Sequence, residues 1–169
     1  ASVDSIGAYA FFETGLKKVT IEDANKMLKT WRGGTYNAYT PFSNSPIEIL
    51  YVGRNLEEGT APFQRFTTIQ KITLSDNVTV VNDGEFYECR GVRTVNFGQN
   101  IATIGKQAFQ NCDTLLYAKL PESVTFIGES AFRDCDTLRS VNIPTKLRVI
   151  YGSTFESCKN LERITIPAS

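Results

Sequence analysis

The sequence predicts a right-handed solenoid with one parallel β-sheet and short turns or 3₁₀ corners, in which about seven coils of roughly 23 residues stack on one another. Three observations predict this fold. A phenylalanine stands three residues before each of four cysteines. The cysteines follow one another at intervals of 23 residues, as Cys89, Cys112, Cys135 and Cys158. Apolar residues recur at fixed distances after each phenylalanine, so residues 23 apart are expected to occupy equivalent places in neighbouring coils.

Each coil is expected to begin at a phenylalanine. The series is Phe11, Phe42, Phe63, Phe86, Phe109, Phe132 and Phe155. Apolar residues lie 6, 9, 11, 15 and 18 residues further on, and in the Phe109 coil they are Leu115, Ala118, Leu120, Val124 and Ile127. The Phe11 and Phe42 coils keep this order with one residue missing after the phenylalanine. Chance does not align so many apolar positions, so the columns are predicted to form one continuous core.

Each part of the coil has an expected conformation. The residues 9 and 11 places after the phenylalanine alternate with polar ones, which predicts an extended strand with its apolar side inward. Pro121, Pro144 and Pro167 follow this strand and should end it, because proline lacks a ladder donor. Gly105 and Gly128 are expected to allow turns with positive φ. The A-F-x-x-C segment is too short for a long helix and predicts a tight helical or 3₁₀ corner.

An insertion interrupts the repeat between the first and second coils. Phe11 and Phe42 are 31 residues apart, and the segment EDANKMLKTWRGGTYNAYT, residues 22–40, fills the interval. It begins like a short helix and ends in a glycine-rich loop. The rest of the chain follows the repeat, so residues 1–169 are predicted to form a single domain.

The composition restricts the chemistry of the chain. It contains no histidine, which removes the commonest general base and metal ligand and excludes Ser-His and Cys-His nucleophile pairs. Lys plus Arg and Asp plus Glu are both 18, so nothing in the net charge favours a nucleic-acid partner. No apolar run reaches the length of about 20 residues needed to span a bilayer, so no membrane insertion is expected in this segment. We therefore expect neither an enzyme nor a cofactor or metal site.

The cysteine column has a structural interpretation. Parallel stacking would place the thiols about 5 Å apart along a line. A line is not the tetrahedron that zinc requires, and parallel Cβ vectors give poor disulfide geometry. We expect free, buried thiols that pack as small apolar side chains.

The repeat unit resembles a known family. The pattern A-F-x-x-C-x-x-L-x-x-V-x-I-P-x-x-V-x-x-I-G, seen in 108–128 and 131–144, is similar to the BspA-like leucine-rich repeats of bacterial surface proteins, which are related to Treponema-type repeats. The resemblance covers nearly the whole chain except 22–40. It implies a single leucine-rich repeat domain, export, attachment to the cell surface, and adhesion to host or bacterial proteins.

Two surfaces are candidates for ligand binding. Residues 8 and 10 places after the phenylalanine should point outward from the sheet, and we call them the strand face. We expect the ligand to contact the members Lys18, Tyr51, Lys71, Thr73, Asn96, Tyr117, Lys119, Asn142 and Arg163. The insertion offers the second set, Trp31, Tyr36 and Tyr39. For both sets the alternative is structural: a solvated sheet face, and aromatics that pack over the end of the solenoid.

These observations predict a non-catalytic, adhesin-like binding protein at the cell surface or outside the cell. Its expected partner is a host or bacterial surface or matrix protein. The alternative is a structural or display scaffold, or a glycan-binding module, of a larger surface protein. Polar capping is not evident after Pro167, so an end-to-end homodimer is a further expectation.

Overall fold

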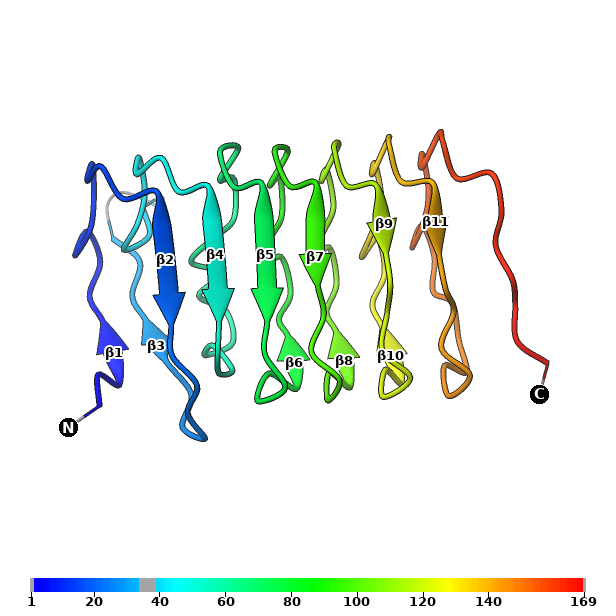
Figure 1. The fold of residues 1–169 in the computed structure, drawn as a ribbon, viewed down its shortest axis with the longest axis horizontal. Helices are drawn as coiled ribbons and strands as arrows, with labels where there is room; N and C mark the ends of the chain where they lie inside the picture. The colour runs from blue at the N-terminus through cyan, green and yellow to red at the C-terminus, as the bar shows by residue number, and fades with distance from the viewer. Residues whose placement is uncertain (1, 34–38, 169) are drawn as a thin grey trace.

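A computed structural model describes residues 2–33 and 39–168 as a row of stacked coils (Figure 1). One strand from each of six coils contributes to a parallel six-stranded sheet in the order β11-β9-β7-β5-β4-β2. Its strands are β2 (Lys18–Ile21), β4 (Ile49–Val52), β5 (Lys71–Leu74), β7 (Thr94–Asn96), β9 (Tyr117–Ala118) and β11 (Ser140–Val141). The structure confirms the predicted parallel solenoid. No helix in the described residues could cross a membrane.

The register of the long sheet follows the 23-residue repeat. Lys71 pairs with Thr94, Thr94 with Tyr117, and Tyr117 with Ser140. An isolated parallel bridge from Ser140 to Arg163 continues the row into the Phe155 coil. Equivalent residues therefore lie side by side in successive coils, as the spacing predicts.

The structure adds strands to the single sheet expected from the sequence. β6 (Val80–Val81), β8 (Thr103–Ile104) and β10 (Phe126–Ile127) form a second parallel sheet on the return path of the Phe63, Phe86 and Phe109 coils. β1 (Ser5–Ile6) pairs with β3 (Lys29–Thr30) in the same way near the N-terminus. These strands have two residues each, too few to show a period-two pattern in the sequence.

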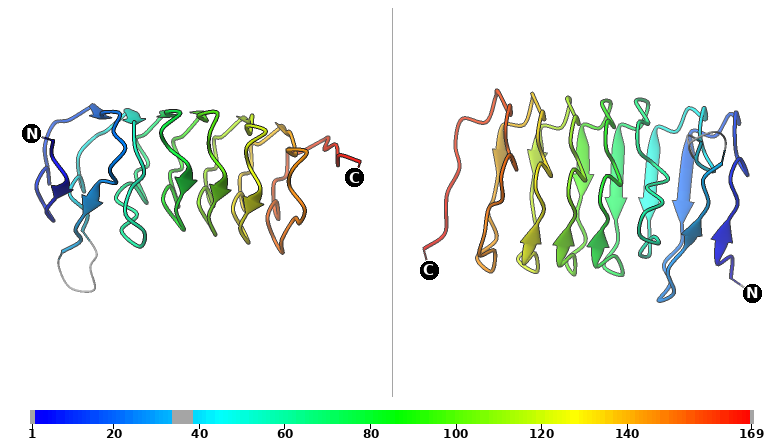
Figure 2. Two further views of the ribbon diagram at one scale, coloured as in Figure 1. Left: turned by 90° about the horizontal axis from the view of Figure 1, so that it is seen from below. Right: turned by 180° about the vertical axis from the view of Figure 1, so that it is seen from behind.

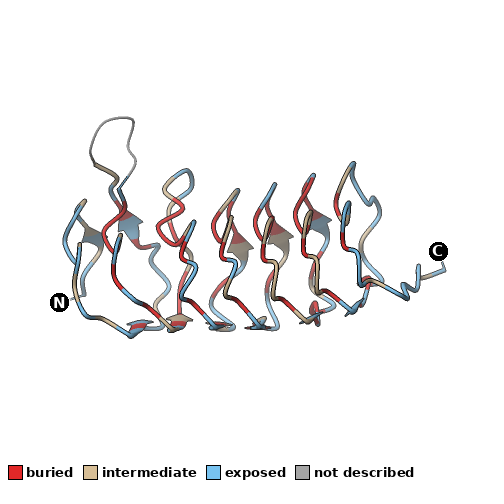
Figure 3. Ribbon diagram, turned by 90° about the horizontal axis from the view of Figure 1, so that it is seen from above, coloured by how far each residue is buried: buried red, intermediate tan, exposed pale blue. Residues whose placement is uncertain are grey.

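The core runs the whole length of the solenoid, between its two rows of strands (Figure 3). Seven phenylalanine rings stack in chain order from Phe11 to Phe155, with centroids 5.2–6.4 Å apart. The four central rings, Phe63, Phe86, Phe109 and Phe132, are fully buried. Each ring is covered on both faces only where a coil precedes and follows it, so the coils depend on their neighbours for burial.

The corners around each phenylalanine differ from the predicted 3₁₀ geometry. Gln107 and Asn111, two residues on either side of Phe109, have left-handed backbones with φ of 56° and 59°. Gly105 and Gly128 were expected to hold the positive φ, and this expectation is wrong. A Cβ atom on Gly128 would lie 2.5 Å from the backbone nitrogen of Lys106 in the preceding coil. Glycine is required there because two coils approach closely.

The segment 22–40 is only partly an insertion. Residues 28–30 belong to the regular coil, because β3 pairs with β1 and Leu28 bridges Leu56 of the next coil. The extra residues lie before and after this strand, and the loop between β2 and β3 extends beyond the neighbouring turns (Figure 1). The predicted short helix is wrong, since residues 22–33 contain no helix. Figure 2 shows the same loops from below and from behind.

The cysteine column is free and buried, and its thiols also form hydrogen bonds. Each Sγ donates to the backbone carbonyl of the phenylalanine in the preceding coil, as Cys112 does to Phe86 at 3.4 Å and Cys135 to Phe109 at 3.2 Å. Ser45 occupies the equivalent place in the Phe42 coil and donates its hydroxyl to the carbonyl of Phe11 at 2.7 Å. In the coils that have cysteine or Ser45 at this position, a small side chain therefore donates a hydrogen bond to the preceding coil.

Candidate binding face

The strand face consists of two parallel rows of side chains on the outer side of the six-stranded sheet. The first row is Lys18, Ile49, Lys71, Thr94, Tyr117, Ser140 and Arg163. The second row is Thr20, Tyr51, Thr73, Asn96, Lys119, Asn142 and Thr165. Tyr51 and Thr73 are half-buried and all the others are exposed. The structure thus places every strand-face candidate on one surface, which the alternation of the strands explains.

The charged side chains of the two rows are all positive, whereas a loop at one end of this surface carries negative charge. Lys18, Lys71, Lys119 and Arg163 are the charged side chains of the two rows. The loop after β2 adds acidic groups beside them. Together with strands β2, β4 and β5, its Glu22 and Asp23 line a shallow hollow of about 600 Å³. This acidic contribution was not predicted, because it comes from a loop outside the repeat.

Hydrogen bonds hold this loop against the sheet. The hydroxyl of Tyr51 donates to Asp23 at 2.8 Å, and the Asn77 amide donates to the other carboxylate oxygen at 3.1 Å. Hydrogen bonds from Ser75, and next from Tyr51, lower the pKa of Asp23 below its usual value. The bond to Asp23 raises the pKa of the Tyr51 hydroxyl. Tyr51 therefore supports the loop as well as forming part of the surface.

The candidates on the strand face are not equally available to a ligand, because some of their polar atoms already form hydrogen bonds within the chain. The Asn142 amide accepts from the backbone N–H of Leu120 at 2.7 Å and donates to the carbonyl of the same residue at 2.8 Å. These two bonds take the place of backbone pairing between the coils, past the end of β9. Tyr117 and Ile49 are large side chains with 54% and 45% of their surfaces exposed. The middle of the face therefore combines an exposed aromatic ring with exposed lysines.

The candidates in the insertion have different environments. Trp31 is 62% exposed. The ring of Tyr39 packs against Tyr9 and Phe12, with centroids 5.6 and 5.4 Å apart. Tyr36 lies outside the described residues. Trp31 is therefore open to a ligand, whereas Tyr39 packs against two aromatic rings of the N-terminal part of the chain.

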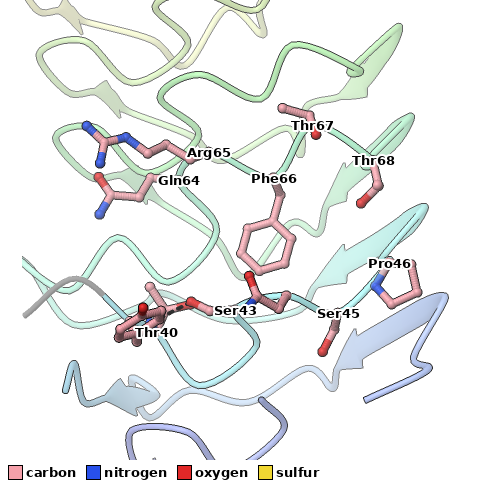
Figure 4. A pocket seen from close by; sticks show the side chains of 11 residues that line it. Thr40, Ser43, Ser45, Pro46, Gln64, Arg65, Phe66, Thr67 and Thr68 are labelled. Atoms are coloured by element: carbon pink, nitrogen blue, oxygen red, sulfur yellow. Dashed lines mark hydrogen bonds between the residues drawn. The ribbon is translucent and has the colours of Figure 1, made fainter. Parts of the chain in front are cut away.

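A groove crosses the corners of the Phe42 and Phe63 coils (Figure 4). Its volume is about 410 Å³. Phe66, which replaces the cysteine of the repeat, points into it. Hydroxyl, amide and guanidinium groups surround that ring, including Thr40, Ser43, Gln64 and Arg65. The groove lies where Phe66 departs from the repeat, and the repeat pattern alone does not predict a groove there.

The described residues hold no group of three or more histidine, cysteine or acidic side chains that could bind a metal ion. Burial raises the pKa of the Cys89 thiol to about 12 and that of Cys158 to about 11. The thiol, not the thiolate, is the stable form of such groups, and the thiol is a weak nucleophile.

One buried carboxyl group has no counterpart in the other coils. Glu85 precedes Phe86, at a place where the next two coils have Ala108 and Ala131, and it is 1% exposed. Its carboxylate accepts the backbone N–H of Asn82 at 2.8 Å. Burial raises the pKa of Glu85 to about 7, although the hydrogen bonds with Asn82 act in the opposite direction. This group titrates in the physiological range.

The stacked coils, the thiol column and the open strand face together define a leucine-rich-repeat-type solenoid. The chain belongs to the BspA type leucine-rich repeat family, whose repeat region matches residues 1–115 and 59–169 with six copies. This membership confirms the resemblance seen in the sequence. No protein with a curated description matches the chain.

Solved bacterial structures share the fold. A leucine-rich repeat protein from Bacteroides ovatus is 26% identical with a TM-score of 0.77, over 95% of this chain and 39% of that one. A leucine rich cell surface protein from Faecalibacterium prausnitzii is 20% identical with a TM-score of 0.68, over 98% and 52%. The leucine-rich repeat protein of T. pallidum is 22% identical with a TM-score of 0.56, over 72% and 71%. The chain thus spans about half or less of the length of the first two relatives.

Proposed function

We propose that the chain is a non-catalytic binding module that recognises a protein partner through its strand face. The observation that carries this proposal is the register of the two rows, which puts a contiguous set of lysine, arginine, tyrosine and polar side chains on one rigid sheet. Arginine and tyrosine are favoured at the centres of protein interfaces.

The charge of the face favours a particular kind of partner. The two rows supply four cations and no anion, so an acidic protein surface would complement them. The hollow beside β2 has acidic groups at its edge, and it would orient such a partner by repelling acidic groups at that end. An extended sheet with a shallow hollow suits a broad protein surface better than a small substrate, which usually needs a deeper pocket.

The proposal includes a location at the cell surface or outside the cell. Family membership and the cell-surface relative from Faecalibacterium prausnitzii support it. The partner would then be a host or bacterial surface or matrix protein.

Reversing two charges on the face tests the proposal. A solid-phase screen against purified extracellular-matrix proteins first identifies a bound protein. Lys71→Glu combined with Lys119→Glu should then weaken binding to that protein at least about tenfold, because the exposed cations would become repulsive to an acidic surface. Surface plasmon resonance at two salt concentrations measures the effect.

The matched control reverses two lysines outside the six-stranded sheet. Lys106→Glu with Lys159→Glu changes the net charge equally, and both lysines are in exposed ion pairs that contribute little stability. Binding should be retained in this control. Unchanged affinity in the strand-face variant would place the site elsewhere, with Trp31 as the next candidate.

The groove at the Phe42 and Phe63 corners favours a second candidate function, glycan binding. Its hydroxyl, amide and guanidinium groups are hydrogen-bonding groups of the kind that would bind sugar hydroxyls. A glycan array, with competition by free sugar, distinguishes the two functions. A positive array together with a negative protein screen would favour the groove over the strand face.

A further inference from the structure

Among the described residues, the backbone hydrogen bonds that join the corners of neighbouring coils are missing at the groove shown in Figure 4. Beyond the groove, the N–H of Arg65 donates to the carbonyl of Tyr87 in the following coil at 2.6 Å. Asn44 holds the same place in the coil before the groove, but its N–H donates to no acceptor in the described part of the chain. The carbonyl of Gln64, at the acceptor place of the repeat, likewise accepts no hydrogen bond there. The gap lies between two coils that both have further coils beyond them.

The side chain of Phe66 accounts for this gap. In the following coils a cysteine at its place donates to the phenylalanine carbonyl of the preceding coil, as Cys89 does to Phe63 at 3.0 Å. Phe66 has no donor, and its larger ring points into the groove and meets Phe63 edge-on, with centroids 6.2 Å apart. A phenyl ring needs more room than a thiol, so these two corners cannot close on each other as the others do.

The wall of the groove carries short polar groups. Thr40, Ser43 and Thr67 contribute hydroxyls, and Asn44 and Gln64 contribute amides. Hydroxyl and amide groups both donate and accept hydrogen bonds, as the hydroxyls of a sugar do. The volume of about 410 Å³ lies within the range of small-molecule sites, roughly 300–1,000 Å³. The groove therefore suits a sugar better than an apolar ligand.

One end of the groove is positively charged. Figure 4 shows Gln64 and Arg65 at this end, with Pro46 and Thr68 at the other. The Gln64 amide, with its oxygen turned towards Arg32, accepts hydrogen bonds from both terminal nitrogens of that guanidinium. Burial, and next the charge of Arg65, lower the pKa of Arg32 below its ordinary value. Two guanidinium groups therefore lie close together at the Gln64 end.

The positive charge at this end is only partly compensated. Arg65 pairs with Glu88, with 3.4 Å between its Nε and the carboxylate. The Nε of Arg32 is buried and has no hydrogen-bond partner among residues 2–33 and 39–168. Glu13 accepts the Asn44 amide at 3.4 Å and adds a negative group beside the groove. A negatively charged ligand group is therefore favoured at the arginine end.

We propose that the groove binds a sugar acid, a saccharide that carries a carboxylate, with this carboxylate at the end formed by Gln64, Arg65 and Arg32. The inference rests on the glycan-binding function proposed for the groove and names the class of sugar. Guanidinium groups form charge-assisted hydrogen bonds with carboxylates, and these are stronger than bonds between neutral groups. The hydroxyls of the sugar bond to the polar groups of the wall.

A glycan array with matched ligands tests this assignment. It carries sugars with uronic or sialic acid, the methyl ester of each, and neutral sugars of the same length. Acidic sugars should bind at least about tenfold more tightly than their own esters, because esterification removes the charge and keeps the shape. Sugars that bind equally well as acids and as esters would overturn the sugar acid and leave glycan binding at the groove. An array without any bound sugar would overturn both.

Isothermal titration calorimetry with the tightest acidic sugar then locates the site. Arg65→Gln and Arg32→Gln should each weaken the acid about tenfold and leave its methyl ester unchanged, which also shows that the groove is intact. The matched control, Arg90→Gln, removes an exposed charge that pairs with Asp113 outside the groove, and binding should be retained.

The strand-face variant separates the two proposed sites. Lys71→Glu combined with Lys119→Glu should keep full affinity for the acidic sugar, because neither lysine lines the groove. Loss of sugar binding in that variant, with unchanged binding in Arg65→Gln, would place the sugar on the strand face and overturn the proposal. Circular dichroism checks that every variant remains folded.

Discussion

Replacing Phe109 with alanine is expected to lower the free energy of unfolding by about 3–5 kcal/mol. Its side chain is fully buried, and it stacks on Phe86 and Phe132 with centroids 5.3 and 5.4 Å away. Phe97 also meets it edge-on at 5.6 Å. Alanine would leave a cavity at the junction of three coils, and the stacked backbones on both sides could not collapse to fill it. Urea denaturation followed by circular dichroism measures the loss.

The control is Phe126→Ala, which removes the same group from a side chain that is 40% exposed. Its expected cost is about 1 kcal/mol or less. Equal costs for the two variants would contradict the continuous aromatic stack, because the difference depends on burial between coils.

Neutralising Glu85 is expected to stabilise the protein at high pH and to leave it unchanged at low pH. The folded pKa is about 7, against an ordinary value of 4.5. Below about pH 4.5 the carboxyl group is neutral in both states and has no cost. As the pH rises from there towards 7, the unfolded chain releases its proton while the folded chain keeps it, so stability falls. Above pH 7 the accumulated loss is about 3 kcal/mol.

Glu85→Gln keeps the shape of the side chain and removes its titration. The difference in unfolding free energy between this variant and the wild type should be near zero at about pH 4 and should rise to about 3 kcal/mol in favour of glutamine at about pH 8. Taking the difference at each pH cancels the other carboxyl groups. A difference that does not change with pH would show that Glu85 has an ordinary pKa and is hydrated in the folded state.

The sequence was sufficient to predict the parts of the fold that repeat. The apolar columns and the strand alternation come from residues such as Leu115, Ala118 and Leu120, whose spacing alone determines which side chains point inward. The same alternation identified the exposed strand-face positions. Their role in binding remains a prediction.

The structural features that the sequence did not predict depend on contacts that leave no recognisable residue pattern. Left-handed residues such as Gln107 and Asn111 are not glycines, and the backbone bonds that stabilise them carry no side-chain pattern. The bond from Tyr51 to Asp23 joins the repeat to a loop outside it. Residues 28–30 were assigned to the insertion because the 31-residue interval from Phe11 to Phe42 breaks the 23-residue spacing, and their pairing with β1 and Leu56 leaves no pattern in the sequence.

The central claim is that residues 23 apart occupy successive coils, and a series of distances tests it most directly. Spin labels are placed on cysteines introduced at Lys18 together with Tyr117, Ser140 or Arg163, all exposed residues of the first row of the strand face. The four native thiols are buried and should not react. Pulsed electron resonance should give distances near 19, 24 and 29 Å, increasing by about 4.8 Å for each added coil. Distances that fail to increase in equal steps would contradict the stacked coils and the strand face built on them.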